Sequence, residues 1–464
     1  MSELRELARF AREFRLESAP QKVADAARLC VLDSVGAALG AAEYDEIPAV
    51  CRELRKWTES KSAYQASVWA QGFRLDVFQA LLLNGIMGHA LELDDVHTGS
   101  KSHVGAVVVE TAWTLAEAAG KTGKNFLESV VVGYEIMSRV GMAMDVVSNR
   151  KRGWHGTGII GTFGAAAAAG RLLELTEDEM VWALGMAGTQ SSGLWAFLKE
   201  GSTCKKLHPA RAAVNGLTAA ILAKGGMTGP EHILDAKDGG LYRAISDSFD
   251  LSRLTRGLGE DFEILHIDKK PYPCCRTTHH AIDGALALKR KLEQEIMDGQ
   301  PLDPGQIEKV VVETYEVGVL QCGFTGYPRS PVEAKFSIPY TTAAALMRGR
   351  VSLTEFTREA LEEERIKMTA GKVCVVSDAM FSERYPARWG SRVRITLTDG
   401  IEYIKQIDDM SGSSACPLTR QQEKEKFEGL VEPILGKEET KRLEEEILSI
   451  DQMEEIPKIR TTSM

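Results

Sequence analysis

The repeat of apolar residues changes once along this chain, and the change restricts the folds it can adopt. From the start to about residue 260, apolar side chains recur with the period of a helix. The first helix shows this period in Leu4, Leu7, Ala8 and Phe14. Thr176-Glu-Asp-Glu179 has the form of a capping box, and the alanine run at 165–169 suits closely packed helices. Four glycines are expected to separate helices: Gly99, Gly120, Gly133 and Gly201. This half is predicted to be all-α.

Strand-like segments appear after residue 265. Arg392 to Leu397 alternates polar and apolar residues, meets Asp399-Gly400 and resumes at Ile401, which predicts a β-hairpin. Two further strands are expected at 307–313 and 372–376. Helical segments are expected between the strands, near 279–292, 335–347 and 353–363.

These patterns predict a mainly α protein of two domains, for which 464 residues are sufficient. Residues 1–265 would form a large all-α helical domain, and residues 266–409 a separate, smaller α+β domain. Residues 410–464 are charged and helical. The pattern alone leaves open whether this last segment packs on the helical half or stands in solvent.

Charge and cysteine usage narrow the class of protein. The net charge of -10 argues against a nucleic-acid partner and provides no basic patch for a membrane surface. The eight cysteines show no Cys-x-x-Cys spacing, which indicates a reducing cytoplasm. The first residues include acidic side chains and no long apolar run, so neither a signal peptide nor a membrane span is expected.

The most unusual polar stretch runs from His89 through Asp94, Asp95 and His97 to His103. It follows an apolar run at 77–87, and so brings three imidazoles and two adjacent carboxylates to the end of a buried helix. Polar groups are buried in this way only when their hydrogen bonds are satisfied. Titratable groups of mixed type in such a place suit proton-transfer chemistry.

A second block, Gly153 to Gly161, contains His155 and a Gly-x-Gly-x-x-Gly spacing. No strand precedes it and no parallel βαβ unit surrounds it, so a dinucleotide site is not expected. The glycines are instead predicted to allow close helix packing, with His155 facing a cavity. A third block, Gly201 to Pro209, contains lysines that are either surface charges or cations for a substrate carboxylate.

A fourth block runs from Lys270 to His280, where two prolines impose an extended approach and a helix is expected to follow. Its N-terminus and Arg276 would bind an anion. A catalytic pair formed by Cys274 and Cys275 is the weaker alternative, since the spacing of a resolving thiol is absent. A fifth block, Glu333 to Tyr340, has the pattern of an amphipathic helix start.

In their order, these blocks resemble the MmgE/PrpD family, whose members include 2-methylcitrate dehydratase, cis-aconitate decarboxylase and iminodisuccinate epimerase. The matching stretches cover much of the chain. They are Asn-Gly-x-x-x-His-x-x-x-x-Asp-Asp at 84–95, His103, Trp-His-x-Thr-Gly at 154–158, Lys-x-Leu-His at 205–208, Lys-Pro-Tyr-Pro-x-Cys-Arg at 270–276 and Ala-Lys-Phe-Ser at 334–337.

The resemblance implies that the C-terminal tail returns to the helical domain and that the smaller α+β domain is inserted between these two parts as a lid. It also implies a homodimer with a metal-free and cofactor-free site in the interdomain cleft. The family's catalytic residues correspond by position to Asp94 or Asp95, His103, His155, Lys205 and Tyr340. Lys270, Cys275 and Arg276 are expected to bind the substrate.

Two departures from the family pattern bear on the reaction. This chain has Glu92 and Val96 at the positions where the decarboxylases have Asp and Thr. It has Cys275 where those enzymes have a histidine. The resemblance therefore favours a dehydratase of a di- or tricarboxylate, with an epimerase as the alternative and a decarboxylase less favoured.

The expected chemistry is removal of a proton alpha to a carboxylate, which requires cations to stabilise the resulting negative charge. The chain offers three such cations, Lys205, Lys270 and Arg276. His103 or Asp94 could serve as the base, and His155 or Tyr340 as the acid.

Two other classes of protein stay open. A metal-dependent hydrolase could use His89, Asp94, Asp95 and His97, whose types and spacing suit a metal, although the resemblance opposes it. A binding or scaffold protein without activity is the other class, and the retained charged blocks oppose it.

Overall fold

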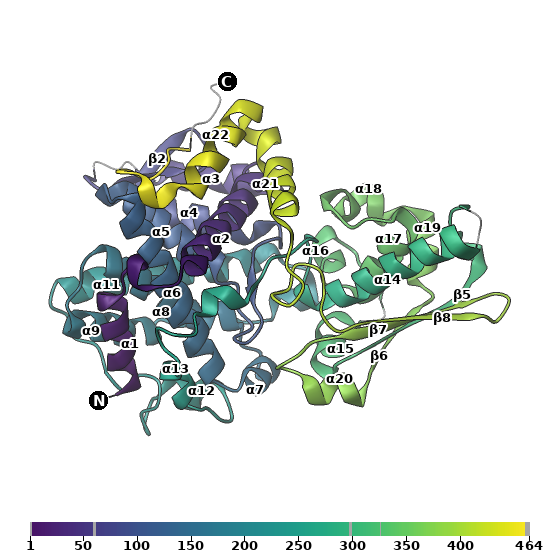
Figure 1. Cartoon of the computed structure of the whole chain (residues 1–464), viewed down its shortest axis with the longest axis horizontal. Helices are drawn as coiled ribbons and strands as arrows, with labels where there is room; N and C mark the ends of the chain where they lie inside the picture. The colour runs from purple at the N-terminus through teal and green to yellow at the C-terminus, as the bar shows by residue number, and fades with distance from the viewer. Residues whose placement is uncertain (1, 59–61, 297–298, 325, 460–464) are drawn as a thin grey trace. The chain divides into compact units, whose positions relative to one another are not determined.

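The computed structural model describes residues 2–58, 62–296, 299–324 and 326–459, and it is mainly helical with a small sheet (Figure 1). The chain divides into two compact units. Unit 1 contains residues 1–196, 204–269 and 419–464, and unit 2 contains residues 197–203 and 270–418. Both units are thus assembled from segments that are distant in sequence.

The core of unit 1 lies where α4, α5, α6, α8 and α11 pack against one another. Almost every residue of α6 and α8 is buried, as expected for helices at the centre of a large bundle, and the buried Glu135 and Arg139 of α6 form an ion pair. The helices of unit 1 are α1 (Glu3–Glu13), α2 (Gln21–Gly40), α3 (Ile47–Lys56), α4 (Val77–Ala90), α5 (Gly105–Ala119), α6 (Gly123–Ala143), α7 (Val146–Lys151), α8 (Gly156–Leu172), α9 (Glu177–Gly188), α11 (Leu207–Lys224), α12 (Leu241–Ile245), α13 (Ser252–Thr255), α21 (Arg420–Leu435) and α22 (Lys437–Leu448).

Small residues set the spacing of these central helices. A Cβ on Gly216 of α11 would lie 2.5 Å from Ala165 Cβ of α8, and one on Gly158 would lie 2.2 Å from the Ser192 carbonyl oxygen. The predicted role of the glycines and alanines at 156–169 in close packing is confirmed. The prediction that Gly133 separates helices is wrong, because Gly133 lies inside α6, where a Cβ would come within 2.5 Å of Val108.

The C-terminal segment packs on unit 1, which answers the question that its charged pattern leaves open. Helices α21 and α22 both contact α2, and the yellow pair lies beside the purple helix in Figure 1. Their apolar faces are buried through Phe427, Leu430, Leu443 and Ile447. Burial of one apolar stripe explains how so charged a segment takes part in a core.

The helical half is not all-α, contrary to the prediction. Strands β1 (Gln65–Val68) and β2 (Phe73–Asp76) form an antiparallel pair, and β3 (Val96–His97) pairs with β4 (Ile267–Asp268). Gly72 supports the first turn with φ +69°. Strands this short carry too few residues for their alternation to emerge from the surrounding helical pattern.

Unit 2 contains a four-stranded sheet of order β6-β5-β7-β8, in which only the β5–β6 pair is parallel. Its strands are β5 (Ile307–Thr314), β6 (Val373–Ser377), β7 (Ser391–Leu397) and β8 (Glu402–Ile407). In β7 the alternate residues Val393, Ile395 and Leu397 are buried, and Gly400 turns the chain into β8 with φ +83°. The predicted strands and hairpin are confirmed.

Helices α14 and α17 pack on each other, and α14 covers β7 and β8. The predicted helix at 353–363 is instead a 3-10 turn at Leu353–Phe356 followed by the short α18. The helices of unit 2 are α10 (Phe197–Glu200), α14 (His279–Lys291), α15 (Glu316–Cys322), α16 (Pro331–Ala334), α17 (Ile338–Arg348), α18 (Arg358–Leu361), α19 (Glu364–Ala370) and α20 (Ala379–Arg384).

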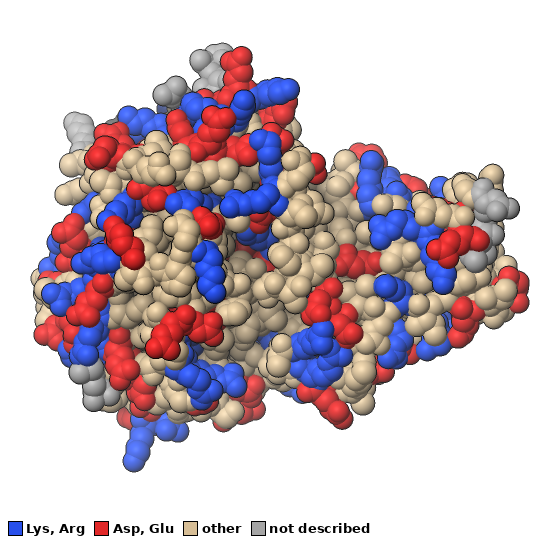
Figure 2. All heavy atoms as spheres, in the orientation of Figure 1, with Lys and Arg blue, Asp and Glu red and all other residues tan. Residues whose placement is uncertain are grey.

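The charges of the surface are mixed. On the face that Figure 2 displays, basic and acidic side chains alternate without a continuous basic patch. Among the described residues, no helix is both long enough and apolar enough to cross a membrane.

Candidate active site in unit 1

The end of α4 turns sharply into the polar block that the sequence singles out. Asp76 caps the start of α4 through its side chain, and the helix ends at Ala90. Glu92 then adopts φ +57°, a left-handed conformation that costs a residue with a side chain roughly 1–2 kcal/mol. This turn leads through Asp94 and Asp95 into β3, so the acidic pair lies at the foot of a buried helix.

Asp94 lies between two histidines. Its Oδ2 atom is 2.7 Å from His89 Nδ1 and 3.0 Å from His103 Nδ1, and the carboxylate is fully buried. His103 Nδ1 also lies 3.0 Å from the Asp95 carbonyl oxygen. A carboxylate that accepts from Nδ1–H leaves Nε2 of the neutral ring as its basic atom. This arrangement therefore prepares His103 to accept a proton at Nε2.

Lys205 forms an ion pair with Glu92 beside these histidines. Its Nζ lies 2.5 and 2.6 Å from the two Glu92 carboxylate oxygens, and both side chains are 8% exposed. Glu92 Oε1 also lies 3.7 Å from His89 Nε2. Lys205 comes from the 3-10 turn Thr203–Lys206 that leads into α11. A buried ammonium in this position suits a substrate carboxylate.

His155 and His208 form a neutral imidazole pair. Their Nδ1 atoms are 2.9 Å apart, and the His155 and His89 rings lie 6.3 Å apart. Burial lowers the pKa of His155 well below its ordinary value, and the Lys205 cation lowers it further. Burial also lowers the pKa of His208 to about 4, with smaller contributions from His89 and Lys205. Both rings are therefore neutral near pH 7 and can donate as well as accept a hydrogen bond.

Asp95 faces a different environment from Asp94. Its carboxylate accepts hydrogen bonds from the Gly105 amide at 2.8 Å and the Tyr134 hydroxyl at 2.5 Å. Burial raises the pKa of Asp95 to about 7. The side chain thus joins α5 and α6 to the loop, and only its backbone carbonyl contacts His103.

Four of the predicted site residues belong to unit 2. Lys270 is fully buried, and the Cys275 amide donates to the Lys335 carbonyl at 2.8 Å. The Arg276 guanidinium lies 4.4 Å from the Trp389 ring centre. The Tyr340 hydroxyl donates to the Glu355 carbonyl at 2.5 Å, and burial raises the pKa of Tyr340 well above its ordinary value.

The structure places four of the predicted residues close together within unit 1: Asp94, His103, His155 and Lys205. Their catalytic role stays a prediction. Three further side chains contact these four but are absent from the predicted catalytic residues: His89, Glu92 and His208. Their spacing could have indicated that they belong to the site. His89 and Glu92 stand three positions apart, as do Lys205 and His208, and residues at this spacing can share one side of a turn.

The ligands of the metal-dependent alternative do not come together as the sequence suggests. His97 Nδ1 lies 2.9 Å from Ser100 Oγ and its Nε2 lies 3.1 Å from Glu263, while Asp95 binds Tyr134. Within the described chain, His89, Asp94 and His103 do offer three ligand atoms within 4.8 Å of one another. Two imidazoles and a carboxylate suit a divalent transition metal, which would replace the hydrogen bonds of Asp94 with metal bonds.

Comparison with known proteins identifies the class to which this fold and site belong. The MmgE/PrpD N-terminal domain matches residues 5–254, and the MmgE/PrpD C-terminal domain matches residues 272–452. The chain therefore belongs to the MmgE/PrpD family, as its motifs predict.

Curated relatives cover nearly the whole chain at low identity. A cis-aconitate decarboxylase-like protein of Aspergillus oryzae is 27% identical over 96% of this chain and 94% of its own length. A cis-aconitate decarboxylase of Aspergillus terreus is 25% identical over 97% and 94%. A 2-methylcitrate dehydratase of Salmonella typhimurium is 25% identical over 82% and 79%. The chain is an enzyme of the kind that these lyases represent.

Proposed function

We propose that the protein is a lyase that eliminates water from a hydroxylated di- or tricarboxylate. The observation that carries this proposal is the Asp94 carboxylate, which bridges His89 and His103 beside the Lys205 ammonium. The similarity to a 2-methylcitrate dehydratase supports the substrate class. A positioned base next to a buried cation is what removal of a proton alpha to a carboxylate requires.

In the proposed reaction, His103 Nε2 takes the proton from the carbon alpha to the carboxylate. The electron pair of the broken C–H bond passes into an enediolate-like carboxylate, whose charge Lys205 stabilises; a single well-placed donor of this kind contributes about 3–4 kcal/mol to barrier lowering. The pair then forms the C=C bond as the C–O bond of the hydroxyl group breaks. The departing hydroxyl group takes a proton and leaves as water.

We assign the acid role to His155. It is neutral near pH 7, and a His208 Nδ1–H that donates to His155 Nδ1 would leave the proton of His155 on Nε2. Tyr340, the other acid considered, is less suited because its hydroxyl group donates to the Glu355 carbonyl oxygen.

Decarboxylation is the second candidate reaction. The similarity to two fungal proteins, one named cis-aconitate decarboxylase and the other cis-aconitate decarboxylase-like, favours it. The same cation and histidines could act, with loss of carbon dioxide in place of water and a proton delivered to the remaining carbon. Epimerisation is the third candidate reaction. It begins with the same proton removal, but no group leaves and a proton returns to the same carbon.

Proton NMR in deuterated water distinguishes these reactions on a panel of citrate-like, malate-like and amino-dicarboxylate compounds. A dehydratase gives vinylic signals and a rise in ultraviolet absorbance without gas release. A decarboxylase releases carbon dioxide, and an epimerase incorporates deuterium without loss of a group. Full turnover of the reactive compound by both Lys205→Ala and His103→Ala would overturn the assignment of the site.

The metal-dependent alternative has its own test, which is dialysis against a strong chelator followed by assay with and without added divalent ions. We expect full activity after chelation. A loss that zinc or another divalent ion restores would instead assign His89, Asp94 and His103 to a metal site.

We infer from the family resemblance that the protein is a homodimer. Light scattering coupled to gel filtration measures the mass of the particle, and a monomer would contradict this inference.

A further inference from the structure

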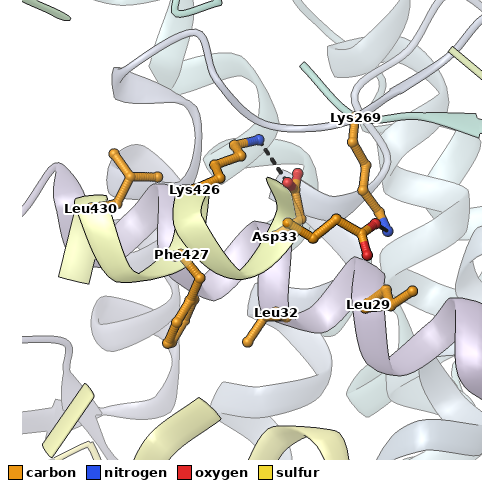
Figure 3. Close-up of a pocket in the computed structure, with 9 residues that line it drawn as sticks. Leu29, Leu32, Asp33, Lys269, Lys426, Phe427 and Leu430 are labelled. Carbon is orange, nitrogen blue, oxygen red and sulfur yellow. Dashed lines mark hydrogen bonds and ion pairs between the residues drawn. The ribbon is translucent and has the colours of Figure 1, made fainter. Parts of the chain in front are cut away.

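The C-terminal helix α21 contacts the loop of the active site through one side chain. Lys426 Nζ donates a hydrogen bond to the Leu93 carbonyl oxygen at 2.9 Å and forms an ion pair with Asp33 Oδ1 at 2.6 Å. Figure 3 shows the Lys426 ammonium directed from α21 toward the Asp33 carboxylate. Leu93 stands directly between Glu92 and Asp94, so Lys426 binds the backbone of the site itself.

The position of the Leu93 carbonyl group constrains the backbone of Asp94. The peptide bond that joins Leu93 to Asp94 is planar, so a bond that holds the Leu93 oxygen also holds the Asp94 amide and Cα. The preceding residue, Glu92, has φ +57°, a conformation that persists only when the surroundings impose it. Rotation of this peptide would move the Asp94 carboxylate away from the two Nδ1 atoms that it contacts.

A second ion pair lies one helical turn away. Glu423 of α21 pairs with Lys269 at 2.5 Å, and Lys269 directly follows β4, the partner of β3. The two ion pairs line the hollow shown in Figure 3. Four apolar side chains complete this lining: Leu29, Leu32, Phe427 and Leu430. Its volume of about 10 Å³ has room for about one water molecule, so these charges do not serve a substrate-sized ligand.

Because the Lys426–Asp33 ion pair is buried, it is expected to contribute little to the free energy of unfolding. The two side chains are 11% and 5% exposed. The cost of removing two charges from water offsets most of their attraction, and apolar residues of similar volume often replace such a pair without loss. What apolar residues cannot supply is a hydrogen bond to the Leu93 carbonyl oxygen. This contact therefore points to a positional function.

We propose that Lys426 is a positioning residue, which holds the Leu93 carbonyl group so that the Asp94 carboxylate stays on His89 and His103. The kinetic test rests on the proposed function, and the spectroscopic test rests on the geometry alone. Asp33→Asn/Lys426→Met removes both charges and the bond to Leu93, so that no buried charge is left without its partner. Asp33→Asn alone keeps the bond to Leu93.

In steady-state assays the double variant should lose about 10–100-fold in kcat, the effect of a displacement near 1 Å, while KM changes by less than about threefold. Asp33→Asn should stay near the wild-type kcat, and Lys426→Arg, which keeps a donor, should recover part of the loss. Glu423→Gln is the matched control, because it breaks the neighbouring pair on the same helix. Equal losses of kcat in Glu423→Gln and the double variant would overturn the proposal.

Nitrogen-15 NMR of labelled histidine measures the same effect without any reaction. The ring signals of His89 and His103 should move in the double variant, and those of the exposed His232 should not. If the wild-type protein converts no carboxylate, the proposed function fails while this measurement still decides the role of Lys426. Unchanged His89 and His103 signals in a folded double variant would show that Lys426 does not position Asp94.

Discussion

Asp94 and Asp95 show how two identical neighbours acquire different chemistry. The loop directs Asp94 toward two imidazoles and Asp95 toward an amide and a phenol. Both carboxylates are buried, so their partners rather than their exposure distinguish them. Asp94 is therefore the side chain placed to orient the proposed base His103, and Asp95 is the side chain that fastens the loop to α5 and α6.

Asparagine substitutions separate these two roles. Asp94→Asn keeps the size of the side chain but removes the charge that orients His103 and stabilises its protonated form, so kcat should fall by about 10²–10⁴-fold. Asp95→Asn still offers an oxygen to the Gly105 amide and should reduce kcat by less than about tenfold. Steady-state kinetics on the reactive carboxylate measures both. A larger loss in Asp95→Asn than in Asp94→Asn would reverse the assignment.

Stability should depend on pH through Asp95. Its folded-state pKa of about 7 exceeds the ordinary value of 3.8, so the folded protein binds this proton more tightly than the unfolded chain. This stabilisation is complete below about pH 4 and is lost as pH rises toward 7. Between pH 5 and pH 8 the wild-type free energy of unfolding should fall by on the order of 3 kcal/mol more than that of Asp95→Asn.

Denaturant unfolding at several pH values measures this difference. Asp247→Asn, at an exposed position, should give a curve parallel to that of the wild type. Parallel curves for Asp95→Asn as well would show that Asp95 does not carry the pH dependence.

The sequence singles out the residues of the candidate site, but it does not predict which of them pair with one another. Motifs identify Asp94, His103, His155 and Lys205, because charged and imidazole groups next to buried apolar runs are unusual enough to stand out. The Glu92–Lys205 pair joins residues 113 positions apart, and no local pattern predicts it. Which residue neutralises a cation, and which carboxylate faces a histidine, depends on the packing of α4 against α11.

Among the helices and strands, the packing of α8 can be predicted from the sequence, whereas the formation of β1 cannot. The alanines and glycines of α8 form a run long enough to predict close packing, and Asp399-Gly400 predicts its hairpin from two residues. Strand β1 has four residues, too few to show a strand alternation even though its partner β2 follows after a short turn, and β3 has two residues and pairs with β4, about 170 positions away. Long or strongly specified elements are therefore predicted, and elements of two to four residues are missed, whether their partner is near or distant in the sequence.

Two glycine substitutions in helices should have opposite effects. Gly216→Ala introduces a Cβ 2.5 Å from Ala165 Cβ and 2.6 Å from the Ala166 amide nitrogen. The crowding should outweigh the better helix propensity of alanine and lower the free energy of unfolding by about 1–2 kcal/mol. Gly429→Ala in α21 meets nothing within 4 Å and should raise it by about 0.5–1 kcal/mol.

Thermal and denaturant unfolding of the two variants measure these changes. Helix propensity is the same in both exchanges, so their difference isolates the contact between α8 and α11. Stabilisation by Gly216→Ala would show that the two helices separate readily.

For the whole molecule, the sequence indicates a change of character near residue 265 but not the full membership of each unit. Residues 197–203 belong to unit 2, although they lie between helices of unit 1 in the sequence. Phe197 packs on Phe336 with ring centres 6.1 Å apart. This contact joins positions too far apart for any periodicity to reveal. Whether residues 266–409 act as a lid stays a prediction.

A chain built of two compact units should respond locally to damage in either core. Ile395 is fully buried at the centre of β7 in unit 2, and Ile395→Ala should cost that unit about 2–5 kcal/mol. Hydrogen–deuterium exchange read by mass spectrometry should then rise in β5, β7 and α14 while peptides from α6 and α8 keep wild-type protection. The exposed Ile404→Ala serves as the control and should change little. A matching rise in α6 and α8 would mean that both units unfold together, because the loss of packing in one sheet would then be transmitted to the whole molecule.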